Sequence, residues 1–396
     1  MVHIHKYKEV YRFGSIKKLA VIIFIASLAN ALYGTIWAAY LENLVHNSST
    51  VGFINSFLTV MAFISYFIFI PIIEKYDKAK LFLIAMFFVA TSYFLLYLSD
   101  NIFLVILFAT MLTVSASLKI TSFGILVKDN SPRKKLSRNE GLIYTFMNSA
   151  WVIGPLLASF IILKYQDKNI FLISAILTII TLLVFLKFNF KDVKGKSKSD
   201  NNTLKNFIGF FKSKDRIIAY SLGAGVTTWW SLIFIFIPLL ILDSGLKEQW
   251  IGIFLFAVAI PLIILEIPMS KIVGRKGFRK MFMISYIFVA VIALICFFVT
   301  QIYTILLLLI LASFGLAILE PNTEAYFFDI LKGKERYHYY GPYNTTVDVG
   351  QFLGMITSSV ILLFLPFKYV FLVYSGWMFF FFLLSFKTKD IIESNK

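Results

Sequence analysis

The stretch GLIYTFMNSAWVIGPLLAS, residues 141–159, has a counterpart 200 residues further along the chain, GPYNTTVDVGQFLGMITSS at residues 341–359. Small residues recur in both at the same positions, and the spacing of four between positions 150, 154 and 158 places these three on one face of a helix. The aligned pairs are Gly141 with Gly341, Ala150 with Gly350, Gly154 with Gly354, Ala158 with Ser358, and Ser159 with Ser359. The chain therefore repeats itself, and this repeat decides its fold.

The same offset relates other parts of the two halves without a gap. It aligns glycines with glycines and charged residues with charged residues in the connections between spans. A shared preference for apolar residues does not produce such matches. The pairs are Gly52 with Gly252, Lys75 with Arg275, Lys80 with Lys280, Asp129 with Asp329, Lys168 with Lys368, and Lys187 with Lys387. Residues 51–190 and 251–390 are thus two copies of one structural unit.

The composition is that of a membrane protein. Of the 396 residues 59% are hydrophobic and 44 are phenylalanine, and the mean hydropathy is +0.82. About twelve apolar stretches are long enough to cross ~30 Å of hydrocarbon. They lie near 18–43, 50–73, 80–98, 101–127, 140–163, 168–188, 216–242, 249–273, 279–299, 302–328, 337–364 and 367–386. We predict an all-α membrane protein with twelve transmembrane helices in two six-helix repeats.

An even number of spans per repeat gives both halves the same orientation, which is typical of transporters whose substrate lies between the halves. In the connection between the sixth and seventh spans, apolar residues at helical spacing lie between lysines. They indicate a short helix on the inner membrane surface, with a solvated linker as the alternative. These residues are Leu204, Phe207, Ile208 and Phe211. The predicted parts are an N-terminal six-helix bundle (1–188), a cytoplasmic linker (189–215) and a C-terminal six-helix bundle (216–396).

The basic residues predict the orientation. Of the 38 lysines and arginines, 33 lie in the alternate connections that include both termini, four lie in the opposite connections, and Lys119 lies within a span. By the positive-inside rule both termini face the cytoplasm, in a multi-pass protein of the cell (plasma or inner) membrane. This asymmetry accounts for the net charge of +17, so nucleic-acid binding is not needed to explain it.

The small residues of the repeated stretch predict close helix packing. Ala150, Gly154 and Ala158 share one face, and small faces let another helix approach closely. Pro155 cannot donate a backbone hydrogen bond to the preceding turn and favours a bend, and its counterpart is Met355. We expect this face, and the face of Gly350 and Gly354, to pack against the opposite half. Packing within one half is the alternative.

These features resemble the major facilitator superfamily over nearly the full chain. The loop IPIIEKYDKAK at 70–80 is similar in charge to the family motif Gly-x-x-x-Asp-Arg-x-Gly-Arg, with Glu74 and Lys78 in place of Asp and the last Arg. The fifth span keeps the spacing of the antiporter motif Gly-x8-Gly-x3-Gly-Pro-x2-Gly-Gly. The matching residues are Gly141, Ala150, Gly154, Pro155, Ala158 and Ser159. In the family this motif is typical of proton-coupled drug exporters.

Ionisable groups inside the predicted spans are expensive to bury and mark substrate or proton pathways. They are Lys119, Glu266, Glu320, Glu324 and Asp348. Because the resemblance implies that spans 1, 4, 7 and 10 line a central cavity, Lys119 and Glu320 are expected to face each other across it. A carboxyl group in low-dielectric surroundings can exchange protons near neutral pH. We rank Glu320 first as proton carrier, then Asp348, Glu324 and Glu266; a static ion pair, or a helix–helix hydrogen bond from Asp348, is the alternative.

Two further groups follow from the resemblance. Glu74, Lys78 and Asp129 are expected to form a cytoplasmic latch that stabilises the outward-facing state, with solvated loop charges as the alternative. Aromatic residues of spans 1 and 7 are expected to bind an apolar or cationic ligand, although packing is the commoner role. They are Tyr33, Trp37, Trp229 and Trp230.

The leading hypothesis is a secondary transporter that exports a small amphipathic compound by alternating access against proton entry. Proton-coupled uptake of a small metabolite and a non-transporting membrane sensor are the alternatives. A membrane enzyme is disfavoured because the four histidines lie in termini or loops and no catalytic cluster is evident. With Cys296 as the single cysteine there is no Cys-based metal site. We expect no metal or cofactor, a proton gradient as energy source, a monomer, and the lipid bilayer and substrate as partners.

Overall fold

The computed structural model describes residues 13–131, 136–190, 203–331 and 335–392, and every regular element in these ranges is a helix. The first half contains α1 (Phe13–Val45), α2 (Ser48–Lys75), α3 (Lys78–Leu98), α4 (Ile102–Asp129), α5 (Leu136–Lys164) and α6 (Asn169–Phe188). The second contains α7 (Thr203–Phe210), α8 (Lys214–Ser231), the π-helix η2 (Leu232–Phe236), α9 (Ile237–Asp243), α10 (Gln249–Lys276), α11 (Phe278–Phe298), α12 (Ile302–Ile330), α13 (Glu335–Asn344), α14 (Thr346–Phe364) and α15 (Lys368–Ser385).

Eleven of the described helices or helix chains are long and apolar enough to cross a membrane, and the bent α10 brings the number to twelve. The prediction of an all-α membrane protein with two sets of spans is confirmed. The seventh span is a chain of three elements, α8, η2 and α9, that runs from Lys214 to Asp243.

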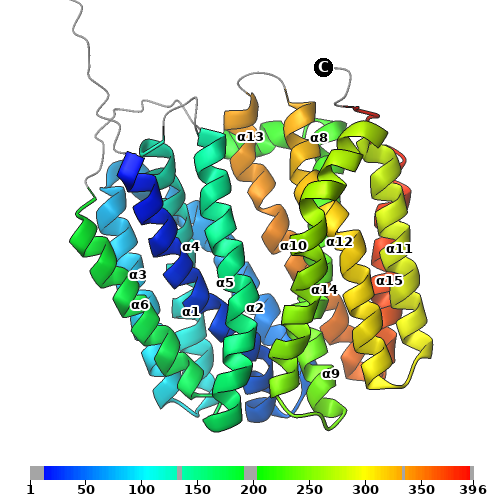
Figure 1. Ribbon diagram of the computed structural model, residues 1–396, viewed down its shortest axis with the longest axis horizontal. Coiled ribbons are helices and arrows are strands. Elements are labelled where there is room, and N and C mark those ends of the chain that lie inside the picture. The colour runs from blue at the N-terminus through cyan, green and yellow to red at the C-terminus, as the bar shows by residue number, and fades with distance from the viewer. Residues whose placement is uncertain (1–12, 132–135, 191–202, 332–334, 393–396) are drawn as a thin grey trace, which may run out of the picture.

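The two halves pack in the same way, and two pairs of helices make the main contacts between them, while α1 also contacts η2, α9 and α10. Within the first half α1 packs on α5 and α6, and α3 packs on α4 and α6; within the second, α14 packs on α8 and α11 on α12 and α15. Between the halves α2 packs on α14 and α10 packs on α5. In Figure 1 α1–α6 form one group and α8–α15 the other, and the groups converge towards one end.

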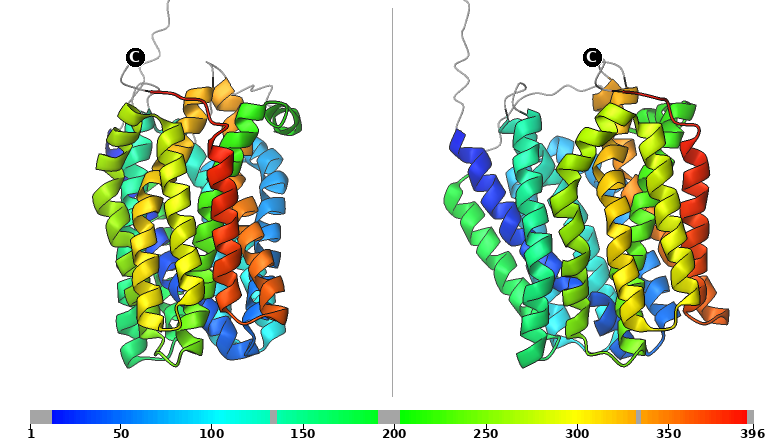
Figure 2. Two further views of the ribbon diagram at one scale, coloured as in Figure 1. Left: turned by 90° about the vertical axis from the view of Figure 1, so that its right-hand side faces the viewer. Right: turned by 45° about the vertical axis from the view of Figure 1, so that its right-hand side comes forward.

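We call the end where α1 begins and α15 ends the terminal end, and the opposite end the distal end (Figures 1 and 2). Polar residues set several helix starts. Asn47 accepts a hydrogen bond from the Thr50 N–H before the distal end of α2, and Asp77 accepts one from the Lys80 N–H before α3. Such caps satisfy N–H groups that have no partner inside the helix.

Proline and glycine set the shape of α10. Its segments Gln249–Leu265 and Pro268–Lys276 meet at 54°, and a proline removes a hydrogen bond and its ring clashes with the preceding turn. The helix ends at Gly277, whose positive φ of 85° suits a residue without a Cβ. The corresponding α2 is one continuous helix, although Pro71 lies inside it.

Candidate functional site at the interface between the halves

At the distal end the first connection between the halves is the crossing of α2 and α14. The Ser49 hydroxyl donates a hydrogen bond of 2.7 Å to the Ser359 carbonyl. A Cβ added to Gly52 would collide with the Ser359 hydroxyl and with the Phe236 ring. Glycine is therefore needed here because the two helices are in contact at this point.

The second connection, between α5 and α10, uses the repeat counterparts of the same residues. The Ser159 hydroxyl donates a hydrogen bond of 2.8 Å to the Gln249 carbonyl. A Cβ added to Gly252 would collide with the Pro155 carbonyl and the Ser159 hydroxyl. We refer to the two connections as the α2–α14 crossing and the α5–α10 crossing. Together they close the distal end on both sides of the interface.

A polar contact adds to this closure. The Asn43 side-chain amide at the end of α1 donates a hydrogen bond of 2.7 Å to the Glu248 carboxylate just before α10. Burial raises the pKa of Glu248 above its ordinary value of 4.5, although the hydrogen bond from Asn43 opposes the shift. The bond joins the two halves at the distal end.

Between the crossings and the terminal end, the interface is lined by aromatic side chains and a methionine. The Thr59 hydroxyl of α2 lies 3.7 Å from the Met355 sulfur of α14. The Phe234 ring of η2 meets the Trp151 ring of α5 at 5.5 Å and the Trp230 ring of α8 at 5.6 Å. A π-helical turn often marks a functional position, and here it directs an aromatic ring towards the other half.

Asp348 is the buried acid of this interface. It lies in the first turn of α14 with 9% of its surface exposed. Tyr66 of α2 and Tyr220 of α8 interact with it electrostatically, so groups from both halves face it. Within the part of the chain that the structure describes, no basic side chain pairs with it.

Glu324 lies nearer the terminal end and also faces the other half. It interacts with the Tyr340 hydroxyl of α13 and with Tyr144 of α5. Nearby, the Phe67 ring of α2 meets the Phe207 ring of α7 at 4.9 Å. The halves therefore meet at this end through side-chain tips, whereas the distal crossings bring helix backbones together.

The expected Lys119–Glu320 pair is absent. Lys119 is buried with 7% exposure and has no hydrogen-bond or ion-pair partner among the described residues. It shares a helix face with Phe123, whose ring packs 5.6 Å from Phe82 of α3, so this face is directed into the first half. Glu320 is exposed on α12 and has an interaction partner of its own. The Glu266 side chain lies outside the described residues.

The predicted aromatic residues divide into two groups. Tyr33 packs on Tyr93 and Phe171 inside the first half, and the Trp37 indole donates a hydrogen bond of 2.9 Å to Asn55 of α2. Trp229 is fully buried inside the second half, and its ring lies 6.2 Å from the Tyr374 ring. Of the four predicted aromatic residues, Trp230 is the one with a ring contact in the interface cluster described above.

The expectation that the small faces pack against the opposite half is wrong for three glycines. A Cβ on Gly154 would meet Ala31 of α1, one on Gly350 would meet Ala224 and Thr227 of α8, and one on Gly354 would meet Ser231 of α8. Each contact lies within one half. Ala150 and Ala158 are fully buried, and nothing lies within 4 Å of a Cβ on Gly141. Two residues of the motif do contact the opposite half, the Pro155 carbonyl through Gly252 and the Ser159 hydroxyl through Gln249.

The proposed latch residues lie at the terminal end. Lys78 begins α3 and Asp129 ends α4, and each has an interaction partner. The Glu74 side chain lies outside the described residues. The latch therefore stays a prediction.

Several interface residues were not predicted as site residues. Ser49, Gly52, Ser159, Gly252 and Ser359 lie at the crossings, and Trp151 lies in the aromatic cluster. The repeat carried a usable signal, because Gly52 matches Gly252 and Ser159 matches Ser359 at the offset of 200. Small residues kept in both copies indicate a contact made twice.

Two six-helix groups that face each other across two antiparallel crossings define a membrane transporter fold of the two-repeat type. The family model of the Major Facilitator Superfamily matches residues 19–260 and 222–392. The chain belongs to the major facilitator superfamily, a family of transporters and not of enzymes.

Solved structures with low sequence identity share this fold. The nucleoside transporter NupG is 16% identical, with 94% of this chain and 99% of that chain covered and a TM-score of 0.76. A POT family transporter in complex with 5-aminolevulinic acid is 13% identical, covers 93% and 94%, and has a TM-score of 0.78. A D-xylose-proton symporter is 10% identical, covers 95% and 98%, and has a TM-score of 0.74. No curated protein sequence matches the chain.

Proposed function

We propose that this protein is a secondary transporter that works by alternating access, with the terminal end in the cytoplasm. The observation that carries the proposal is the pair of repeat-related crossings, which close the distal end with equivalent repeat positions on both sides of the interface. Contacts that two equivalent repeats make together can also break together when the repeats rock. The excess of basic residues at the terminal end supports this orientation.

Asp348 is the proton-carrying group of this proposal. A buried carboxyl group without a basic partner favours its protonated form, and solvation favours the charged form. Because residues of both halves face Asp348, a movement of the halves changes its surroundings and so its affinity for a proton. Glu324 is the second group, since Tyr144 of the other half interacts with it. The proton gradient is then the energy source, and the mechanism calls for no cofactor.

Export of an amphipathic compound is the proposed direction. It is supported by the spacing of the fifth-span motif and by Pro155, whose carbonyl lies at the α5–α10 crossing. The Trp151, Trp230 and Phe234 rings supply an aromatic surface between the halves that suits such a compound.

The test is transport by the purified protein in vesicles with an imposed proton gradient. Fluorescent dyes, nucleosides, pentoses, short peptides and organic anions are the compounds to screen. We expect flux that depends on the gradient and is lost in Asp348→Asn, whereas Asp243→Asn, which changes an exposed acid at the end of α9, keeps it. Gradient-driven flux that is unchanged in Asp348→Asn would overturn the role of Asp348. Flux without any gradient dependence would overturn proton coupling.

A further inference from the structure

The connection between the halves contains α7, a helix that lies crosswise to the spanning helices at the terminal end (Figure 2). One side of α7 is fixed to the second half. Phe210 is fully buried and packs against the rings of Tyr220, Phe327 and Tyr339 at 5.8 to 6.1 Å. This ring cluster gives α7 one defined position on the bundle.

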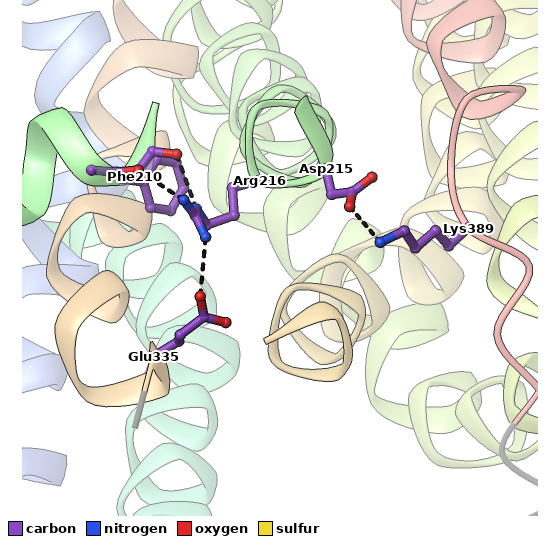
Figure 3. Close-up of polar contacts among 6 residues, drawn as sticks. Phe210, Asp215, Arg216, Glu335 and Lys389 are labelled. Atoms are coloured by element: carbon purple, nitrogen blue, oxygen red, sulfur yellow. Dashed lines mark hydrogen bonds and ion pairs between the residues drawn. The ribbon is translucent and has the colours of Figure 1, made fainter. Parts of the chain in front are cut away.

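Arg216 fixes the carboxyl end of the same helix, as Figure 3 shows. Its Nε donates to the Phe210 carbonyl at 3.0 Å, and its Nη2 donates to the Gly209 carbonyl at 2.8 Å. The guanidinium also lies over the Tyr339 ring at 4.1 Å and pairs with Glu335 at 3.4 Å. Because these carbonyls lie at the end of the helix, where the following turn gives each only one long backbone hydrogen bond of 3.3 or 3.4 Å, Arg216 both caps α7 and ties it to α8.

The opposite side of α7 and the turn that follows this helix are exposed and combine apolar with basic side chains. Ile208 is 55% exposed and Phe211 is 43% exposed. Lys205 lies one turn before Ile208 and Lys212 one turn after it, and both are exposed. The exposed side thus has the pattern of a helix that lies in the headgroup region of a bilayer, with apolar residues inserted and lysines among the headgroups.

The charges of this region favour an anionic partner. Asp215 pairs with Lys389 and Glu335 pairs with Arg216, so both nearby acids are engaged on the protein side (Figure 3). Lys212 and Lys214 have no acidic partner among the described residues. Lys214 also begins α8, where the helix dipole disfavours a cation. An external anion would pair with both lysines and would offset the unfavourable helix dipole at Lys214.

We propose that the exposed side of α7 and of the turn that joins it to α8, with Ile208, Phe211, Lys212 and Lys214, is a binding site for anionic phospholipid headgroups of the leaflet at the terminal end. A phospholipid fits better than a free phosphate because acyl chains cover Ile208 and Phe211 while the phosphate meets the lysines. The proposal needs only the transmembrane fold, so it stands or falls independently of the proposed transport activity.

The Phe207 ring gives this site a consequence for the interface. Phe207 belongs to α7, which is fixed to the second half, yet its ring contacts Phe67 of α2 in the first half. A lipid that holds α7 in the headgroup layer therefore also holds the side chain that reaches across to α2. Lipid binding is expected to favour the conformation in which this contact is made.

The first experiment counts bound lipid on the intact protein. The protein is reconstituted in nanodiscs of phosphatidylcholine with phosphatidylglycerol at 3:1, extracted, and its retained phosphatidylglycerol is measured by native mass spectrometry. We expect the double variant Lys212→Gln, Lys214→Gln to lower the affinity about 25-fold, since each of the two basic residues near an anionic surface contributes about a fivefold factor. The matched control is the double variant Lys271→Gln, Lys276→Gln, which removes two exposed lysines of α10, also at the terminal end. It should retain as much phosphatidylglycerol as the wild type.

A second measurement is needed in case most of the retained phosphatidylglycerol is bound elsewhere on the protein. An environment-sensitive fluorophore on Phe211→Cys, in a Cys296→Ala background, reports whether this side enters the bilayer. We expect a blue shift and protection from acrylamide that increase when phosphatidylglycerol is added. Equal spectra in pure phosphatidylcholine and in the mixture would overturn the preference for anionic lipid. Equal losses in both double variants would also overturn the proposal.

Discussion

The α2–α14 and α5–α10 crossings are one contact made twice, yet their hydrogen bonds run in opposite directions. At the first, Ser49 at the start of α2 donates to the carbonyl of Ser359. At the second, Gln249 replaces the first serine, and Ser159 on the partner helix donates to the Gln249 carbonyl. The Ser359 hydroxyl makes no hydrogen bond across its crossing and instead donates to the Met355 carbonyl in its own helix at 2.7 Å. Both copies keep the close approach of the two helix backbones, whereas the direction of the hydrogen bond between them differs.

This difference separates what the fold requires from what one half does. Gly52 and Gly252 are kept because any side chain would force the helices apart. Pro155 has no counterpart in the second half, where Met355 stands, and α10 is bent at 54° while α2 is not. We infer that the shared glycines serve distal closure and that the unshared proline serves the direction of transport.

The largest effect is expected from exchanging the unshared residues. Met355→Pro places a proline inside α14 and should destabilise the protein by about 3 kcal/mol, because a helix hydrogen bond is lost and the ring clashes with the turn before it. Pro155→Met should fold normally and alter the transport rate. The free energies of unfolding come from denaturant titration in mixed micelles. Equal stability of Met355→Pro and wild type would show that both crossings tolerate a proline.

The next largest effect is expected from filling the crossings. Gly252→Val and Gly52→Val should each disfavour the closed distal end by about 1–3 kcal/mol, the usual cost of overpacking. The readout is the rate at which a membrane-impermeant maleimide labels Thr59→Cys, which lies below the α2–α14 crossing. Labelling should rise about tenfold in a Cys296→Ala background. Gly124→Val is the control, since nothing lies within 4 Å of a Cβ there; an equal rise in the control would contradict the prediction.

A smaller effect is expected from the serines. Ser49→Ala and Ser159→Ala each remove one hydrogen bond between the halves and should weaken closure by about 1 kcal/mol. Ser359→Ala should have less effect, because its hydroxyl bonds within α14 while its carbonyl accepts from Ser49. The same maleimide assay compares the three variants. If Ser359→Ala opened the distal end more than Ser49→Ala, the opposite hydrogen-bond directions would have no functional meaning.

The smallest effect concerns Glu248. Closure buries its carboxyl group and raises its pKa above 4.5, so the protonated form is favoured in the closed state. This contribution to closure is full below pH 4.5 and is lost as the pH rises through the raised pKa. Labelling of Thr59→Cys should therefore increase with pH across this window, and Glu248→Gln should remove the dependence while keeping an acceptor for Asn43. A steeper pH dependence in Glu248→Gln would mean that another group controls closure.

The sequence predicted the helices and the repeat because both rest on composition and on an offset that can be counted. It did not predict which face of a helix meets which neighbour. Gly154 and Gly350 have the spacing of a close contact, but spacing alone does not distinguish Ala31 in the same half from a helix of the other half. The charge of Lys119 was visible, whereas its direction into the first half follows from the packing of Phe123 on Phe82.

The aromatic residues show a second reason for such errors. Tyr33 and Trp230 are equally plausible from sequence, since each lies on a span expected to line the cavity. Their roles differ because the π-helical turn at Leu232–Phe236 brings Phe234 to Trp230 and Trp151, while Tyr33 packs on Tyr93. A local change of helix type has no marker in the sequence pattern, so this part of the interface needed the structure.

The central claim is that the two crossings open as one unit. Electron–electron distance measurements on spin labels at Thr50→Cys and Val360→Cys report the α2–α14 crossing, and labels at Ile253→Cys and Phe160→Cys report the α5–α10 crossing. All four positions are exposed, and Cys296→Ala removes the native thiol. In the Gly252→Val variant, which alters only the α5–α10 crossing, the account predicts that the distance lengthens for both pairs. Lengthening of the Ile253–Phe160 pair alone would contradict it.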